Sequence, residues 1–572
     1  MKKLIPVVAG ALALGLALTA CGNDDTNDGP GGGTITVPAD GWDINPKAYE
    51  DLKDGGTITI PIASNITTLN TYNTVGNDAE LTFGLGPLTE PWWFTDGTGQ
   101  FTWNPLYLTE EPKPVMEGTQ MVVTMHINPK AVWADGTKIT AEDWIATWLA
   151  LNGEQKDYDL ASSDGWDQVE SVTSSDDGAT VTIKFQAAYP DWLAITSGGP
   201  MRAESVKDAE TFNDGWGDPT TIKGWFSGPF TIESFDKPTS TLTMVRNTNW
   251  WGNTAKLEKI ILKYVAADQM ATAFANGEID YYDIGNNASY YAQAKAAANS
   301  TVRESRGPNY RHFTINAQTP ALQDINVRQA VLMGLDREAI AAADLAGLPV
   351  DTAPMSNNLF VMGQHGYIDL GEQTGLKYDV EGAKAKLEAA GYIMNTTTGF
   401  YEKDGEPLTL FFAVLTGVKT SEDEALMAQN DLKEIGIDLQ FRQINTTTDW
   451  PGVLYDHNFD IVAFSWIGTP FPLNNIGQIY GCDADGTPSD SNFAQLCNPK
   501  VDALKKQIDT EIDADKRLEL GQQAAEEIWS EVHTIPLWQR PQLIGVRDTL
   551  ANIGAWGMAR APYTWVNVGY VA

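Results

Sequence analysis

The first half of the chain is dominated by short runs in which apolar and polar side chains alternate. Residues 57–62 read TITIPI, residues 180–185 read TVTIKF and residues 259–265 read KIILKYV. A period of two places neighbouring side chains on opposite faces of a strand, so these runs predict β-strands with one buried face. The same pattern recurs at 121–127 and 241–245, and strands are therefore expected to dominate this half.

One helix is predicted among these strands, in the stretch TAEDWIATWLAL at 140–151. Thr140 and Asp143 have the spacing of a capping box, which satisfies free N–H groups at a helix start. The apolar side chains that recur at helical spacing are expected to share one face. They are Trp144, Ile145, Trp148 and Leu149.

Beyond about residue 316 the pattern changes to an alternation of helices and strands. The run DVEGAKAKLEAAG has an N-cap residue at Asp379 and stops at Gly391. Strand-like runs follow at 437–441 and 459–466. This alternation is typical of an α/β unit.

A further helix is predicted over the run SEDEALMAQNDLKEIG at 421–436. Ser421 and Glu424 have capping-box spacing, and Gly436 is placed to end the helix. The pattern therefore puts the helix start at Ser421.

The run TIPLWQRPQLIGVR at 534–547 returns to strand character near the C-terminus. The C-terminal strands are therefore expected to rejoin the first part of the chain. The overall prediction is an α/β protein with two lobes, the second inserted into the first, and crossings near residues 316 and 534. No internal repeat is recognisable.

The N-terminus has the pattern of a signal peptide. Lys2 and Lys3 precede an apolar run that ends at Ala20, and a spanning helix needs roughly 20 apolar residues whereas a secretory signal needs fewer. The sequence LTAC at 18–21 resembles the lipobox of bacterial lipoproteins, in which cleavage leaves an acylated cysteine at the N-terminus. We therefore expect residues 1–20 to be a lipoprotein signal peptide and Cys21 to carry lipid. Ordinary cleavage that leaves Cys21 as a free thiol is the alternative.

The residues behind Cys21 are predicted to form a tether. The stretch GNDDTNDGPGGG at 22–33 has no apolar side chain to bury and should stay disordered. We therefore expect residues 21–54 to be a lipid anchor and flexible tether. No later stretch approaches the length of a membrane span.

Composition and charge narrow the function classes. The chain has 572 residues, 42% of them apolar, which suits a globular protein with several folding units. Its net charge of -37 argues against a nucleic-acid partner, because phosphate binding depends on clustered Lys and Arg. An acidic surface that keeps an exported protein soluble is favoured over one that attracts cationic ligands.

Cys482 and Cys497 remain as a pair once Cys21 is assigned to lipid. In a chain directed to an oxidising compartment, an even pair close in sequence predicts a disulfide. Neither a CxxC spacing nor a neighbouring His suggests a metal site, and no cofactor is expected.

The sequence offers little support for an enzyme. It has no HExxH, GxSxG or phosphate-binding GxxxxGK[ST] motif. Its five histidines are widely scattered, and each is expected to be packed or exposed rather than catalytic. A triad assembled from distant segments stays open as an alternative.

The aromatic stretch PWWFTDGTGQFTWNPLY at 91–107 has no helical period. Its rings could line a ligand cavity, or they could fill the core beneath a long loop. The sequence leaves both interpretations open.

Five stretches in order resemble extracytoplasmic solute-binding proteins of family 5, which serve ABC importers of oligopeptides, dipeptides or nickel. The first is VTMHINPKAVWADGTKITAEDWIATW, with a strand, an Asp-Gly turn and a capped helix start. The stretches are residues 123–148, 228–252, 270–280, 322–340 and 377–392.

The resemblance implies a two-lobed fold of the periplasmic-binding-protein type, class II, in which lobes joined by a hinge close on a solute. It places lobe 1 at 55–315, with an inserted subdomain at about 99–221, lobe 2 at 316–529 and the return to lobe 1 at 530–572. It also implies a monomeric receptor on the outer face of the bacterial cytoplasmic membrane. The implied partners are a solute and the permease of an ABC importer.

The ligand class is less clear from the sequence. Peptide binders of the family hold the ligand's amino terminus with an aspartate shortly after a Gly-Trp pair. In the matching stretch here, FSWIGTPFPLNN at 464–475, Thr469 stands where the acid is expected. A buried ammonium without a counter-charge is costly, so either another acid pairs with it or the ligand lacks a free amine.

A peptide remains the leading ligand class because residues 479–504, with their cysteine pair, resemble dipeptide-type binders. An oligosaccharide or glycoside is second, and nickel is least favoured because histidines are sparse. Two alternative functions stay open. The protein could be a secreted hydrolase, or it could be a surface adhesin or sensor built on the same fold.

Residues from three segments are candidate ligand contacts, although each could instead pack the cleft wall. From lobe 2 they are Trp466, Gly468, Thr469, Asn474 and Asn475; from lobe 1, Ser64, Asn65 and Leu69; and near the crossing, Asn309 and Tyr310.

Overall fold

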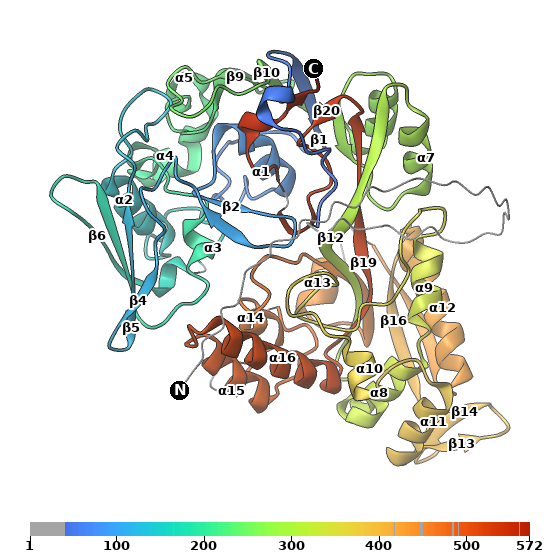
Figure 1. Cartoon of the computed structure of the whole chain (residues 1–572). Coiled ribbons are helices and arrows are strands. Elements are labelled where there is room, and N and C mark those ends of the chain that lie inside the picture. Colours follow the sequence, from blue (N-terminus) through green and yellow to red (C-terminus); the bar gives the residue numbers. More distant parts are fainter. Residues whose placement is uncertain are drawn as a thin grey trace, which may run out of the picture.

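The computed structural model describes residues 41–163, 165–416, 418–445, 450–482, 486–489, 491–559 and 561–572. The expected signal peptide, Cys21 and most of the expected tether lie outside these residues. The described chain forms a mixed α/β structure of two lobes, as predicted, and two long strands join the lobes (Figure 1). In the described part of the chain, no helix is both long and apolar enough to cross a membrane.

Lobe 1 contains two four-stranded sheets. In the first, of order β1-β10-β9-β8, β1 runs parallel to β10 and the other pairs are antiparallel. The second, of order β4-β5-β7-β6, is antiparallel. Their bounds are β1 Thr57–Ile62, β4 Pro114–Glu117, β5 Gln120–His126, β6 Val169–Ser174, β7 Thr180–Phe185, β8 Phe230–Asp236, β9 Thr241–Arg246 and β10 Lys259–Tyr264. All five alternating runs form strands, which confirms that prediction.

The helix predicted at 140–151 is α2, Ala141–Leu151, and its capping box is present. Asp143 Oδ2 accepts a hydrogen bond from the Thr140 N–H at 3.0 Å. The predicted face was only partly right, because Leu149 is exposed while Thr147 and Leu151 are buried with Trp144. Thr147 fits the buried face because its hydroxyl donates to the Asp143 carbonyl.

A six-stranded sheet of order β11-β19-β12-β18-β16-β17 extends through lobe 2 and across to lobe 1. β16 is parallel to β17 and β18, and the remaining pairs are antiparallel. The bounds are β11 Tyr281–Asp283, β12 Ser300–Ile315, β16 Thr409–Leu415, β17 Asp438–Ile444, β18 Ile461–Trp466 and β19 Thr534–Arg547. The strand-like runs predicted at 437–441, 459–466 and 534–547 are thereby confirmed.

The two long strands β12 and β19 connect the lobes (Figure 1). Near the start of β19, Ile535 and Leu537 belong to one large core, whereas Ile544 and Val546 near its end belong to the other. Between these ends the register of β12 shifts between Arg306 and Tyr310. Such a bulge interrupts the hydrogen-bond ladder and bends the strand at the point where the lobes meet.

Helices cover the sheet of lobe 2. They are α8 Ile325–Gly334, α9 Arg337–Asp344, α11 Val380–Ala389, α12 Lys419–Glu434 and α16 Ala514–Glu531. The prediction for α11 is confirmed, because the Asp379 side chain accepts from the Gly382 N–H and Gly391 follows with a φ of 86°.

The predicted capping box of α12 was wrong. The helix begins at Lys419, so Ser421 and Glu424 lie inside it and are fully buried. The Ser421 hydroxyl accepts from the Leu415 N–H at 3.0 Å, and the Glu424 carboxylate accepts from Arg311 at 2.7 and 2.6 Å. The side chains of Ser421 and Glu424, which the spacing predicted to cap the helix, therefore bond to Leu415 and Arg311 instead.

Shorter elements complete the fold. The helices are α1 Ala79–Leu85, α3 Leu193–Thr196, α4 Ala209–Asp214, α5 Pro219–Ile222, α6 Met270–Ala275, α7 Ala288–Ala296, α10 Leu370–Thr374, α13 Trp450–Tyr455, α14 Ile476–Tyr480 and α15 Pro499–Ile508. The strands are β2 Trp93–Thr95, β3 Phe101–Trp103, β13 Ile393–Asn395, β14 Phe400–Lys403, β15 Glu406–Pro407, β20 Leu550–Ala551 and β21 Gly569–Tyr570.

The Cys482–Cys497 disulfide is present, with the two Cα atoms 5.6 Å apart, and this prediction is confirmed.

Candidate functional site

Tyr310 occupies the centre of the junction between the lobes. It lies on β12 opposite Trp466 on β18 and opposite Gln539 on β19. Its hydroxyl donates to the Asn358 carbonyl at 3.1 Å and lies 3.3 Å from the Tyr480 hydroxyl. Burial raises the pKa of Tyr310 well above its ordinary value, so the side chain remains a hydrogen-bond donor.

Trp466 lies within a group of aromatic rings. The imidazole of His312 and the ring of Phe493 are nearly parallel to the indole, with centroids at 5.7 and 6.0 Å. Phe464 meets the indole edge-on at 5.1 Å. Protein rings thus already occupy parallel positions beside the indole.

His312 adds a neutral polar group to this cluster. Burial and the nearby Arg311 guanidinium lower the pKa of His312 to about 3, so its imidazole is uncharged at neutral pH. Its Nδ1 lies 3.3 Å from the Thr314 hydroxyl. His312 is fully buried, so it is one of the histidines that are packed in the protein.

Several buried polar atoms at the junction have no hydrogen-bond partner among the described residues. Three are Trp466 Nε1, Asn309 Oδ1 and Gln539 Oε1, and His312 Nε2 and Asn358 Oδ1 are two others. Gln539 is held in place because its Nε2 donates to the Gly307 carbonyl at 2.7 Å. Buried polar groups are nearly always paired in folded proteins. The Trp466 N–H is a donor and the oxygens of Asn309 and Gln539 are acceptors, so the junction has unused groups of both kinds that a polar ligand could satisfy.

The segment after β18 is held against the bulge of β12. The Gly468 N–H donates to the Pro308 carbonyl at 3.1 Å, and a Cβ atom at Gly468 would overlap that oxygen. The Thr469 hydroxyl accepts from the Phe471 N–H at 3.1 Å, while its carbonyl accepts from Gln364 at 3.2 Å. The hydroxyl and carbonyl oxygens of Thr469 thus both accept hydrogen bonds within the protein.

Asn474 and Asn475 lie just before α14. The Asn474 N–H donates to the Phe471 carbonyl at 3.2 Å, and Asn475 is the N-cap residue of α14 but makes no side-chain cap bond. The same helix ends at Tyr480, which reaches Tyr310. Both asparagines are therefore connected to the junction through a short helix.

Part of the aromatic stretch at 91–107 fills the core of lobe 1, which is one of the two roles that the sequence left open. Trp92, Trp93 and Tyr107 are buried in the core of lobe 1. Phe101, in contrast, stacks on Phe471 of lobe 2 with centroids 5.0 Å apart. One ring of this stretch thus reaches the segment that carries the lobe 2 candidates.

The lobe 1 candidates lie apart from this cluster. The Ser64 hydroxyl donates to Asp78 at 3.3 Å, and Asn65 Oδ1 accepts from the Ser240 hydroxyl at 3.4 Å. Leu69 is only 1% exposed and belongs to the lobe 1 core. The structure therefore brings Asn309 and Tyr310 together with the lobe 2 segment. Ser64, Asn65 and Leu69 instead make these contacts within lobe 1.

Sequence reasoning missed His312, Phe464, Phe493 and Gln539. A period of two does place His312 on the same strand face as Tyr310, and Phe464 on the same face as Trp466. Gln539 could have been noticed as a polar residue within an apolar strand. Phe493 gave no local signal, because its contact with Trp466 depends on how the disulfide-closed loop folds back.

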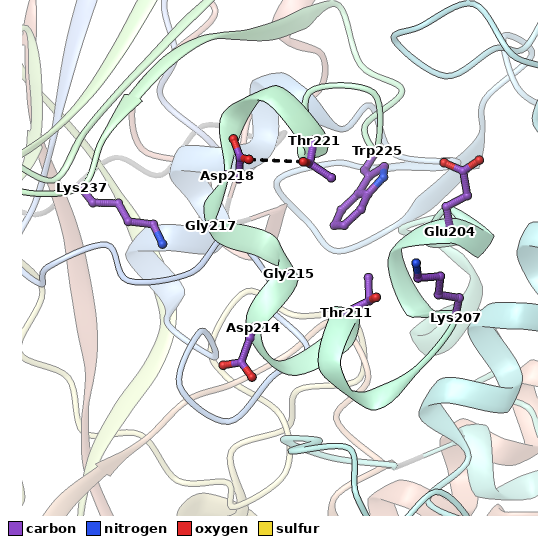
Figure 2. A pocket seen from close by; sticks show the side chains of 10 residues that line it. All are labelled: Glu204, Lys207, Thr211, Asp214, Gly215, Gly217, Asp218, Thr221, Trp225 and Lys237. Atoms are coloured by element: carbon purple, nitrogen blue, oxygen red, sulfur yellow. Dashed lines mark hydrogen bonds between the residues drawn. The ribbon is translucent and has the colours of Figure 1, made fainter.

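A separate cavity of about 580 Å³ lies on lobe 1 (Figure 2). Lys207 and Lys237 lie on opposite sides of it, and Trp225 lies near its middle. Carboxylates of Glu204, Asp214 and Asp218 also line it, so both signs of charge are present. None of the predicted site residues is among the described residues that line this cavity.

Comparisons with known proteins agree with this architecture. Residues 108–487 match the family described as bacterial extracellular solute-binding proteins, family 5 Middle. Over 531 residues the chain is 33% identical to the oligopeptide-binding protein OppA of Mycobacterium tuberculosis (strain ATCC 25618 / H37Rv), covering 91% of this chain and 86% of that protein.

Two solved structures share the fold. The periplasmic EDTA-binding protein EppA has a TM-score of 0.81 at 22% identity, covering 92% of this chain and 98% of that one. The oligopeptide-binding protein AppA from Bacillus subtilis, in complex with a nonapeptide, has a TM-score of 0.69 at 19% identity, covering 91% and 100%. With the family match and the OppA identity, the chain belongs to family 5 of the bacterial extracellular solute-binding proteins of ABC importers.

Proposed function

We propose that the protein is a lipid-anchored receptor that captures oligopeptides or dipeptides between its two lobes and delivers them to the permease of an ABC importer. The observation that carries this proposal is the set of unpaired, buried polar atoms where the strands of the two lobes meet. The 33% identity to a protein named as an oligopeptide-binding protein supports the choice of peptide.

The polar set at the junction suits a peptide backbone. A peptide alternates N–H donors with carbonyl acceptors, and the junction offers the Trp466 N–H with the amide oxygens of Asn309 and Gln539. Because these atoms are buried here, a ligand reaches them only when the lobes separate. Ligand binding would then be coupled to hinge motion, as in other two-lobed receptors.

An uncharged ligand, such as an oligosaccharide, is the second candidate. Thr469 occupies the position where the resemblance leads us to expect an acid, and its hydroxyl and carbonyl are both bonded within the protein. A free amino terminus near this residue would therefore need a carboxylate from elsewhere. A neutral ligand would not.

The proposed location is the outer face of the cytoplasmic membrane. The signal peptide pattern and the LTAC sequence ending at Cys21 support attachment through lipid. The receptor would act as a monomer, with the permease as its partner and no cofactor.

The ligand class can be tested by native mass spectrometry. The protein is purified from cells grown in peptide-rich medium, its intact mass is recorded, and the molecules released by denaturation are identified. We expect a set of small peptides, and we expect a Trp466→Ala variant to retain fewer of them. A protein that retains no peptide but binds oligosaccharides would contradict the peptide proposal and favour the second candidate.

Transport can be tested separately in the producing cells. Deletion of the gene is expected to abolish uptake of the peptides that the purified protein retains. Uptake that survives deletion would instead indicate a sensor or adhesin.

A further inference from the structure

Trp466 is the last residue of β18, so the backbone hydrogen bonds of the sheet do not continue to the residues that follow it. Two of the rings around it, His312 and Phe464, belong to the paired strands β12 and β18 and are fixed by their register. The third ring, Phe493, comes from outside the sheet. The position of Phe493 therefore depends on how its own loop is held.

The two ends of the loop that carries Phe493 are held together. The Cys482–Cys497 disulfide joins residues 15 apart in sequence. Beside it, the buried Asn492 donates to the carbonyls of Gly481 at 3.0 Å and Leu496 at 2.9 Å. The disulfide and this amide thus fasten the same two ends of the loop, and Phe493 directly follows Asn492.

Phe493 contacts the rings of both Trp466 and Phe464. It is parallel to the Trp466 indole at 6.0 Å, with 8° between the planes, and it meets Phe464 edge-on at 5.9 Å. Only 6% of Phe493 is exposed. A ring so enclosed restricts the rotation of the indole and hence the direction of its unpaired Nε1–H.

We propose that Phe493, held by the Cys482–Cys497 disulfide, is the positioning residue that orients the Trp466 indole toward the ligand. The ligand role of Trp466 rests on the proposed function, whereas the orientation of the indole does not. Phe493 does not itself need to touch the ligand. Reduction of the disulfide would loosen Phe493 and thereby weaken ligand binding without removing any ligand contact.

The orientation is measured by fluorine NMR on the full-length exported protein labelled with 5-fluorotryptophan. The Trp466 resonance is assigned by its loss in Trp466→Phe. We expect this resonance to shift in Phe493→Leu, which keeps apolar volume but removes the ring. Phe441→Leu is the matched control, because Phe441 is 38% exposed on β17 of the same lobe, and it should leave the resonance unchanged.

Binding is measured with tryptic casein peptides as the probe, quantified after release from the washed protein. An aromatic pair of this kind corresponds to roughly a fivefold change in affinity, so Phe493→Leu and the reduced wild-type protein should each retain about fivefold less peptide. Reduction should cause little further loss in Phe493→Leu. Circular dichroism identifies any reduced protein that unfolds, in which case Phe493→Leu, with its disulfide intact, decides alone.

A Trp466 resonance that stays in place in Phe493→Leu would overturn the proposal, as would peptide retention equal to that of the wild type. If the wild-type protein retains no casein peptide, the peptide proposal fails instead. The resonance still decides whether Phe493 positions the indole.

Discussion

Arg517 on α16 of lobe 2 forms a bidentate ion pair with Asp191 of lobe 1, a residue 326 positions earlier in the chain. The guanidinium nitrogens lie 2.8 and 2.5 Å from the two carboxylate oxygens. The side chains are only 16% and 7% exposed. Together with the stacking of Phe101 on Phe471, this pair holds the lobes against each other.

Removing one partner of this pair should open the lobes. Arg517→Gln or Asp191→Asn leaves a charge unpaired in a poorly solvated site, which favours separation by about 2 kcal/mol. We expect a larger radius of gyration by small-angle X-ray scattering without ligand, and a smaller effect in the double variant, which buries no lone charge. Lys500→Gln is the control because it breaks an ion pair with Glu527 within lobe 2. Unchanged scattering in both single variants would argue against a closing role.

Gly468→Ala should destabilise the junction. A Cβ atom at this position would overlap the Pro308 carbonyl oxygen, which accepts the Gly468 N–H bond. We expect a loss of about 2 kcal/mol in the free energy of unfolding in urea and reduced peptide retention. Gly198→Ala is a matched control, since its Cβ would contact little besides the Tyr72 hydroxyl at 3.9 Å. Equal stability of the two variants would contradict the packing argument.

Asp344 should make the protein less stable as pH rises. Burial and the neighbouring Glu424 carboxylate raise the pKa of Asp344 to about 8. An unfolded aspartate ionises near pH 4, so the folded protein binds the extra proton between about pH 4 and pH 8 and loses stability across that range. The Trp538 indole N–H donates to this carboxyl group at 2.8 Å, which an asparagine oxygen can still accept.

Asp344→Asn should therefore flatten the pH dependence. In the wild type, the free energy of unfolding should be lower at pH 8 than at pH 5. We expect the variant to reduce this difference by about 2 kcal/mol, which is less than the whole pKa shift would give because the side chain is partly exposed. Chemical unfolding of both proteins at the two pH values measures this. A wild-type protein that is more stable at pH 8 than at pH 5, with the same slope in the variant, would show that Asp344 does not bind the proton.

Cys21→Ala should release the protein from the membrane. Without the thiol no lipid can be attached, and the apolar anchoring energy of the acyl chains is lost. Fractionation of cells should move the protein from the membrane pellet to the soluble exported fraction, with protease accessibility as the check that export still occurs. A variant that stays in the membrane pellet would argue for another mode of attachment.

Much of the fold could be read from local pattern because its causes are local. The period of two at residues 57–62 and the 14-residue run at 534–547 became β1 and β19 with the expected bounds. Asp379 capped its helix because an N-cap bond reaches only three residues along the chain. The disulfide could be predicted because an even pair of cysteines in an exported chain favours one.

Local pattern failed where a distant partner competed for the same group. Ser421 and Glu424 had capping-box spacing, yet Glu424 pairs with Arg311, which lies 113 positions away. Leu149 fell on a predicted buried face, but the docking of α2 turned that side chain to solvent. For Glu424, the long-range ion pair outweighed a capping preference of about 1 kcal/mol.

Several strands, some helix ends and the cysteine pair could be predicted from the sequence alone, but the long strand β12 was not predicted. The predicted strands and helix ends depend on backbone hydrogen bonding and on the alternation of apolar side chains, which act over a few residues. Which side chains contact one another follows from the tertiary structure. Examples are the parallel rings of Trp466 and Phe493 and the unpaired oxygen of Gln539 at the junction, and the ion pair of Arg517 with Asp191 between the lobes. The reason is that these contacts join residues from distant parts of the chain, whose proximity depends on how the sheets and helices pack.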